Sequence, residues 1–117
     1  MARPFYHPSA SDITLDGILH ALADPVRRNI VAMLLANDGI SCSKACGNLP
    51  PSTISHHYRI LREAGVIRSQ KQGVSVINSV RKAELEKQFP KLLATIFKFH
   101  INPAAPFKRR FLWSIGA

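Results

Sequence analysis

Apolar side chains recur at helical spacing in the first third of the chain, with short polar breaks between the stretches. The first stretch presents one apolar face, formed by Leu15, Ile18, Leu19 and Leu22. This spacing predicts a helix, for which Ser11 or Asp12 supplies the N-terminal cap. Asp24 followed by Pro25 predicts the start of a second helix, because a carboxylate caps well and proline fits the first helical position. That helix ends at the turn signal of residues 37–39.

The middle of the chain continues the helical pattern after two consecutive prolines. A short helix is predicted over residues 43–48, and it stops before Pro50 and Pro51. A longer helix is predicted over residues 52–64, and Gly65 closes it. The inner face of this longer helix is formed by Ile54, Tyr58 and Leu61.

A change from helical to strand-like patterning follows. Residues 66–70 and 74–80 are rich in β-branched side chains, and the three-residue loop between them ends in Gly73. This arrangement predicts a β-hairpin with the glycine at positive φ. A short helix then runs up to Phe89, and a last helix runs from position 90 to about position 100, with Pro90 as the break between them.

The order of helix, helix, short helix, helix, hairpin and helix is typical of a winged helix-turn-helix. In that motif the second helix of the pair lies in the major groove and the hairpin reaches along the backbone. The predicted fold is mainly α with a small β-hairpin wing, spans residues 11–100, and uses helices flanking the core for dimerisation. Residues 1–10 are expected to form a flexible arm, because Pro4 and Pro8 block regular structure. Residues 101–117 are expected to form a basic and aromatic tail.

The net charge of the chain restricts the kinds of partner that it is expected to bind. Lys and Arg number 16 against 7 acids, which gives a net charge of +9, and 46% of the residues are hydrophobic. Such a basic excess favours nucleic acid or an anionic membrane. No stretch approaches about 18 consecutive apolar residues, and the start of the chain lacks the apolar core of a signal peptide. We therefore expect a soluble cytoplasmic protein with no membrane partner and a polyanion as its ligand.

The exposed side of the 52–64 helix has the composition of a surface that reads DNA. Short hydrogen-bonding side chains at the start of a major-groove helix read base edges, whereas later cations contact phosphate. Six basic residues and one acid, Glu63, lie between Pro50 and Lys82, and this cluster is the expected electrostatic footprint. The predicted DNA-binding residues are Ser52, Thr53, Ser55, His56, Arg59, Arg62, Arg68, Gln70 and Lys71.

Two ungapped stretches carry a resemblance to a known family. Residues 21–31 (ALADPVRRNIV) and residues 52–67 (STISHHYRILREAGVI) resemble the second-helix and recognition-helix motifs of the ArsR-type winged-helix repressors. The similarity runs from about position 20 to position 80. It implies a homodimeric repressor that binds double-stranded DNA and that, in many members, an inducer releases from the DNA. It also assigns His57 to packing rather than to base contact.

The resemblance leaves the inducer unidentified. Metal-sensing members have Cys-x-Cys at the start of the third helix, whereas this chain has Cys42 with Lys44 in the second position, and Cys46 lies two residues further on. Trigonal arsenite coordination needs three thiolates, and one chain offers two. We interpret Cys42 and Cys46 as small half-buried residues, with thiol or metalloid sensing and metal binding by another route as the alternatives. No metal and no cofactor are predicted.

Catalysis receives little support from the sequence. Adjacent His56 and His57 point about 100° apart on a helix, so they cannot share a ligand. The chain contains no Gly-rich phosphate loop, paired carboxylates or nucleophile elbow. We therefore expect no enzyme. The rival function is a winged-helix interaction module that binds protein or RNA, which only the aromatic tail favours.

A second apolar surface favours a two-fold dimer. The last helix has a broad apolar stripe close to the end of a small domain, which calls for a partner surface. The predicted interface consists of Leu15, Ile18, Leu22, Leu92, Leu93, Ile96 and Phe97. The alternative is that the first helix packs against the last within one chain.

Overall fold

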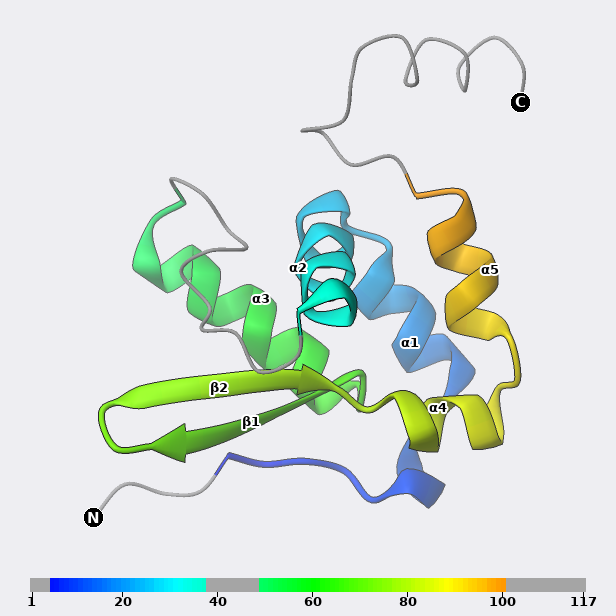
Figure 1. Ribbon diagram of the computed structural model, residues 1–117, viewed down its shortest axis with the longest axis horizontal. Coiled ribbons are helices and arrows are strands. Elements are labelled where there is room, and N and C mark those ends of the chain that lie inside the picture. Colours follow the sequence, from blue (N-terminus) through cyan, green and yellow to red (C-terminus); the bar gives the residue numbers. More distant parts are fainter. Residues whose placement is uncertain (1–4, 38–48, 101–117) are drawn as a thin grey trace, which may run out of the picture.

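The computed structural model describes residues 5–37 and 49–100 (Figure 1). After a short 3-10 turn at Ala10–Asp12, the elements are α1 (Leu15–Leu22), α2 (Pro25–Ala36), α3 (Pro51–Glu63), β1 (Ile67–Gln72), β2 (Ser75–Val80), α4 (Lys82–Gln88) and α5 (Leu92–Lys98). The prediction of a mainly helical fold with one hairpin is confirmed. The helix predicted over residues 43–48 lies outside the described residues, as do the tail and residues 1–4.

Side-chain caps set the starts of the first two helices. Asp24 Oδ1 accepts hydrogen bonds from Val26 N at 2.7 Å and Arg27 N at 3.3 Å, so the predicted start of α2 is confirmed. The predicted cap of the first helix was wrong. Thr14, not Ser11 or Asp12, accepts from Gly17 N at 3.0 Å, because residues 10–12 already form the separate 3-10 turn.

The core lies where α1, α2 and α3 meet the base of the hairpin. Its fully buried side chains come from all of these elements and include Ile18, Ile30, Val31, Leu34, Leu61 and Ile67. Gly65, which ends α3, has φ of +82°, and a Cβ placed there would overlap Ile13. Glycine is therefore required both for the backbone conformation and for the packing of the segment that precedes α1.

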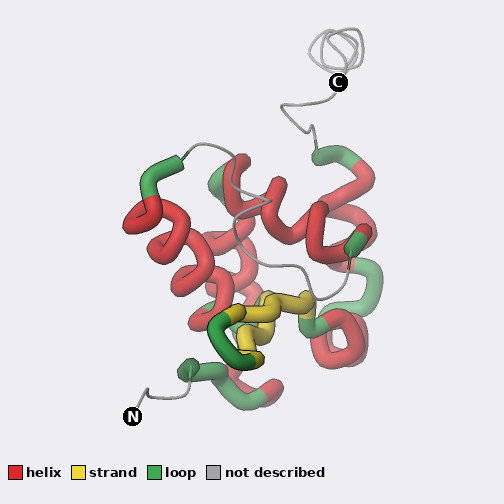
Figure 2. The backbone as a smooth tube through the Cα atoms, turned by 60° about the vertical axis from the view of Figure 1, so that its left-hand side comes forward, coloured by secondary structure: helices red, strands yellow, loops and turns green. Residues whose placement is uncertain are grey.

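The hairpin projects away from the helices. Its strands pair from Ile67 with Val80 to Gln72 with Ser75, which leaves Gly73 and Val74 as the turn. The predicted three-residue loop is thus a two-residue turn, because Gln72 still pairs, while the predicted positive φ at Gly73 is confirmed at +63°. Figure 2 shows the two strands foreshortened, with their turn toward the viewer.

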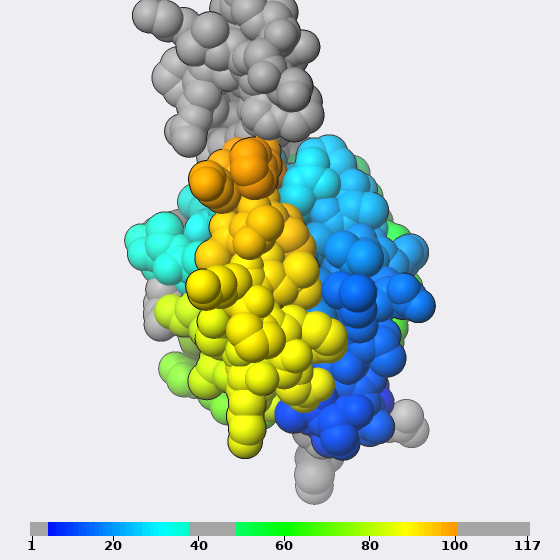
Figure 3. All heavy atoms as spheres, turned by 90° about the vertical axis from the view of Figure 1, so that its right-hand side faces the viewer, coloured from blue at the N-terminus to red at the C-terminus, as the bar shows by residue number. Residues whose placement is uncertain are grey.

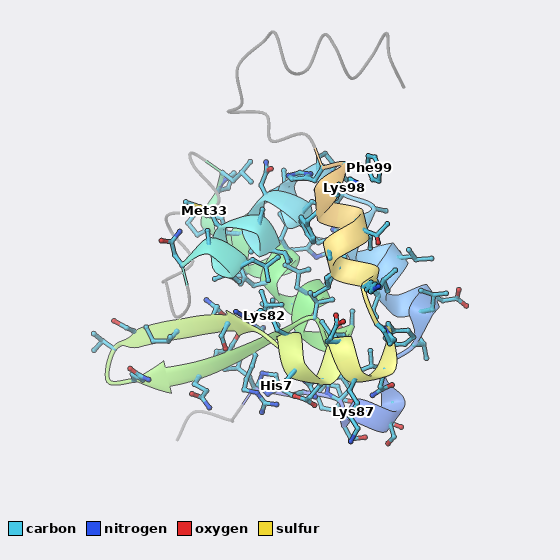
Figure 4. The ribbon with its side chains drawn as sticks, turned by 45° about the vertical axis from the view of Figure 1, so that its right-hand side comes forward. His7, Met33, Lys82, Lys87, Lys98 and Phe99 are labelled. Carbon is cyan, nitrogen blue, oxygen red and sulfur yellow. The ribbon has the colours of Figure 1, made fainter. Side chains whose placement is uncertain are left out.

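The segment before α1 runs beside the hairpin rather than away from the body (Figure 1). His7 Nε2 accepts a hydrogen bond from Ser69 N at 2.9 Å, and Arg81 Nη1 donates to Pro8 O at 2.8 Å. His7 is labelled beside the hairpin in Figure 4. These contacts anchor residues 7 and 8 to β1 and to the end of β2. The flexibility predicted for residues 1–10 stays a prediction, and the anchoring argues against it for this part.

The last two helices meet at a sharp turn. Lys91 has φ of 65°, and its backbone N donates to both carboxylate oxygens of Glu86 at 3.2 Å. This left-handed residue delays the start of the last helix, so α5 begins at Leu92 instead of Pro90. Helix α5 then lies beside α1 on one face of the molecule (Figure 3).

Candidate nucleic-acid interface

Helix α3 has one buried side and one exposed polar side. His57, Tyr58 and Leu61 are buried against the body. The exposed side consists of Ser52, Ser55, His56 and Arg59, and Thr53 is half-buried. Four of the predicted base-reading residues are therefore accessible together on one helix.

The start of α3 leaves its hydroxyl groups unused as caps. Pro50 occupies the cap position, and within residues 5–37 and 49–100 no side-chain hydrogen bond caps this end of the helix. Ser52 and Thr53 therefore follow the cap position and do not occupy it. Further along, Arg59 Nη2 lies 3.3 Å from His56 Nδ1, so these two exposed side chains form a single basic pair.

The tip of the hairpin is the second exposed part of the surface. Gln70 and Lys71 on β1 are exposed, and Val74 in the turn is fully exposed. The exposed side of α3 and the hairpin residues Gln70 and Lys71 together form what we call the reading surface. Its members are Ser52, Thr53, Ser55, His56, Arg59, Gln70 and Lys71.

The base of the hairpin uses its charges differently. Arg68 Nη2 lies 3.1 Å from Glu84 Oε1, and Arg81 Nη2 lies 2.5 Å from Glu84 Oε2. The Arg81 side chain is only 3% exposed. Hydrogen bonds from Arg81, together with the two positive charges, lower the pKa of Glu84 below its ordinary value despite some burial. Arg68 was predicted to contact DNA, and this stays a prediction; in the structure its charge is shared with a carboxylate of α4.

Arg62 is also held within the protein. Its guanidinium lies 4.4 Å from the centre of the Phe5 ring, and its Nη1 donates to Ser69 Oγ at 3.4 Å. Ser69 Oγ in turn bonds Asn78 Oδ1 at 2.5 Å across the hairpin. The predicted phosphate contact of Arg62 therefore competes with contacts that join α3, β1 and the N-terminal segment. The sequence prediction included neither these contacts nor Glu84, because it considered only the charged residues between Pro50 and Lys82.

A buried polar cluster fixes the inner side of α3. Arg27 Nη1 lies 3.3 Å from His57 Nδ1, and Arg27 Nε donates to Ala21 O at 2.6 Å. Burial lowers the pKa of His57, and the charges of Arg27 and His56 act in the same direction against the opposing effect of Asp24. A neutral His57 can accept from Arg27, so this pair ties α3 to the start of α2. The family resemblance assigned His57 to packing, and His57 is indeed buried.

The predicted dimer surface needs a correction in two residues. Ile18 and Leu22 are 0% and 4% exposed and belong to the core of the chain itself, so they cannot cover a partner. The exposed apolar residues of α1 are instead Leu15 and Leu19, and Phe99 is exposed beyond the end of α5. The predicted residues of α5 are half-buried against the core, namely Leu92, Leu93, Ile96 and Phe97.

Two further predictions concern metals and membranes. Within residues 5–37 and 49–100, no three His, Cys, Asp or Glu side chains gather as a metal site would require. No helix in that part of the chain is long and apolar enough to cross a membrane. Cys42 and Cys46 lie outside the described residues, so the interpretation of these cysteines stays a prediction.

Known proteins resemble this chain in sequence. The family described as a helix-turn-helix domain matches residues 22–70, which include α2, α3 and the start of β1. An uncharacterized HTH-type transcriptional regulator of Methanocaldococcus jannaschii is 38% identical over 58 residues, or 48% of this chain. The match spans 65% of that relative's length.

Solved structures resemble the fold over most of this chain. The crystal structure of an ArsR family transcriptional regulator superposes with a TM-score of 0.58 at 25% identity, covering 74% of this chain and 97% of that one. An ArsR-like transcriptional regulator from Rhodococcus sp. RHA1 gives 0.54 at 26% identity, covering 83% and 85%. Rv0081 of M. tuberculosis gives 0.51 at 28% identity, covering 71% and 88%. In fold and in sequence, the chain is similar to ArsR-type winged helix-turn-helix transcriptional regulators.

Proposed function

We propose that this protein binds double-stranded DNA sequence-specifically as a homodimer and represses transcription from a palindromic operator in the cytoplasm. The observation that carries the proposal is the exposed polar side of α3, whose hydroxyl, imidazole and guanidinium groups lie beside an exposed basic hairpin. A helix with this composition fits the major groove, where such groups distinguish base pairs.

The two parts of the reading surface have different roles. Ser55, His56 and Arg59 lie on the exposed side of α3 and read base edges. Lys71 and Gln70 lie on the hairpin and contact the phosphate backbone. The positive end of the helix dipole, where the cap residue Pro50 makes no side-chain hydrogen bond, adds to the attraction for phosphate at the start of α3.

Selection of bound fragments from genomic DNA by the purified full chain tests DNA binding directly. We expect enrichment of an imperfect palindrome whose half-sites are centred about 34 Å apart, one helical turn, or a multiple of it. Retention of all fragments alike, or of RNA in preference to duplex DNA, would overturn the proposal and favour a general interaction module.

The homodimer is proposed on the exposed apolar residues Leu15, Leu19 and Phe99, which continue the half-buried stripe of α5. A single reading helix covers only a few base pairs, so a second copy supplies the contacts that a tight site requires. Sedimentation at micromolar concentration should give about twice the 13.0 kDa of one chain.

Leu19→Glu should reduce the mass measured by sedimentation to that of one chain, because the substitution buries a charge in the proposed interface. Asp16→Asn, on the same helix and exposed, is the matched control and should remain dimeric. A wild-type monomer that still binds one full operator tightly would contradict the dimer and leave DNA binding intact.

A further inference from the structure

A hollow of about 460 Å³ lies between α1, α2 and the end of α5. This volume is within the range of about 300–1,000 Å³ that is common for small-molecule sites. Its lining consists of Leu19, Leu22, Ala23, Arg28, Ile96, Phe99 and His100. Five of these seven residues are apolar, and the two polar ones, Arg28 and His100, are hydrogen-bonded to each other. Phe99, labelled in Figure 4, lies just beyond the end of α5 on this side of the molecule.

Arg28 is a half-buried cation whose partners are all uncharged. Its Nη1 donates to Leu22 O at 2.8 Å and to Ala23 O at 3.1 Å, and its Nε donates to His100 Nδ1 at 3.1 Å. No carboxylate in the described part of the chain pairs with Arg28, and no hydrogen bond there uses its Nη2. The other arginines around the core differ, since Arg27 has Asp24 at 4.0 Å and Arg81 has Glu84. A half-buried charge without a counter-charge is costly, so this part of the hollow favours an anion.

His100 holds Arg28 in place without neutralising it. Its Nδ1 accepts from Arg28, so its Nε2 carries the proton and donates to Asn29 Oδ1 at 2.8 Å. Burial and the charge of Arg28 lower the pKa of His100 below its ordinary value. The hollow therefore combines an apolar wall, a fixed cation and a neutral imidazole, which matches a ligand with an apolar body and a negative head group.

We propose that this hollow binds a small amphipathic monocarboxylate, with its carboxylate on Arg28 and its apolar body against Leu19, Ile96 and Phe99. Binding at this site does not depend on DNA binding, but it requires that the hollow stay open in the proposed dimer. A consequence for DNA binding would depend on the proposed function, because Leu19 and Phe99 also belong to the proposed dimer surface. Occupancy of the hollow would then alter the position of α5 against α1, and with it the spacing of the two reading helices.

Titration of the full chain with octanoate, below its micelle threshold, tests the site by NMR. We expect saturable shifts confined to α1, the start of α2 and α5, with octylamine giving none. Arg28→Met should weaken octanoate binding at least tenfold. Lys87→Met removes an exposed charge from α4, away from the hollow, and should bind as the wild type does (Figure 4).

A second variant leaves the arginine untouched. Ala23 is exposed and lines the hollow, so Ala23→Phe fills it without disturbing the core and should abolish octanoate binding. Equal binding of octanoate and octylamine, or unchanged binding in both variants, would overturn the proposal. If octanoate binding falls as the fraction of dimer rises, the hollow is covered by a second copy of the chain, and the proposal is overturned as well.

Discussion

The exposed side of α3 and the base of the hairpin are both basic, yet they use their charged groups in opposite ways. On α3, the hydrogen-bond partner of Arg59 within the described part of the chain is another exposed side chain, His56. At the base of the hairpin, Arg68 and Arg81 share one carboxylate, Glu84. A run of basic residues in the sequence therefore does not separate cations that are paired with a carboxylate from those that are not. Arg59 on α3 and Lys71 near the hairpin tip are exposed, whereas the charge of Arg68 is shared with Glu84.

The difference follows from what each region must do. Helix α3 is held by its apolar inner side, so its outer side is left for a ligand. A two-stranded hairpin has little core of its own and is marginal in isolation. Arg81, bonded to Pro8 O and to Glu84, links the end of β2 with the N-terminal segment and α4. The base of the hairpin is thus attached by the very cations that a charge count assigns to DNA.

Removal of the shared carboxylate is the strongest test of this comparison. Glu84→Ala leaves the buried Arg81 without a counter-charge, which should lower the free energy of unfolding by about 2–3 kcal/mol. Denaturant unfolding followed by circular dichroism measures the change. Glu63→Ala, at an exposed acid of α3, should change it by less than about 0.5 kcal/mol.

The buried charge itself is tested by a second substitution. Adding Arg81→Met to Glu84→Ala should restore part of the lost stability, because the uncompensated cation is then gone. An equal loss of stability in Glu84→Ala and Glu63→Ala would show that the hairpin base is not attached through this pair.

Sequence preference should reside on α3 alone. Replacement of Ser55 or His56 by Ala removes an exposed hydrogen-bonding group, and should relax the preference at one or two operator positions by about 1–3 kcal/mol each. Binding to operators with single base changes, compared between variant and wild type, measures this. If both variants discriminate as the wild type does, the reading surface is wrongly assigned.

The sequence predicted the elements better than it predicted the uses of their side chains. Helix positions followed from apolar spacing and from Asp24-Pro25, which are local signals. Thr14 as the cap could not be distinguished from Ser11 or Asp12, because all three are good cap residues. The pairing of Arg68 with Glu84 joins residues 16 positions apart, and no local pattern marks it.

The two core residues in the predicted dimer surface, Ile18 and Leu22, have the same explanation. Apolar spacing identifies the face of α1 but not which members of it are covered by α2 and α3. Ile18 is fully buried while Leu19, the next residue, is 48% exposed. Only the packing of three helices together separates a core residue from a residue left for a partner.

The hairpin itself allows a finer comparison between its tip and its base. Lys71 is exposed at the tip, so Lys71→Ala should flatten the log–log dependence of affinity on salt by about 0.9, the value for one phosphate contact. Arg68→Ala should flatten it less, since its charge is already paired with Glu84. Fluorescence anisotropy with a fixed operator between low and moderate salt measures both slopes. Equal changes of slope in the two variants would mean that Arg68 exchanges Glu84 for a phosphate group when DNA binds.

The smallest expected effect concerns the inner side of α3, where His57 accepts from Arg27. Because the pKa of His57 is lowered from 6.5 in the folded protein, the unfolded chain binds the proton more readily between the two values. Its contribution to stability is therefore complete above about pH 6.5 and is lost as the pH falls through that value. The wild type should lose further stability in the same direction from His7 and His100, whose pKa values are also lowered.

His57→Asn keeps an acceptor for Arg27 without a titrating group, so the free energy of unfolding, measured in steps from pH 8 to pH 5, should fall less steeply than in the wild type. His20→Asn, at an exposed histidine of α1, serves as the control. A pH dependence in His57→Asn as steep as in the wild type would place the sensitivity elsewhere and leave Arg27 and His57 as a purely structural contact.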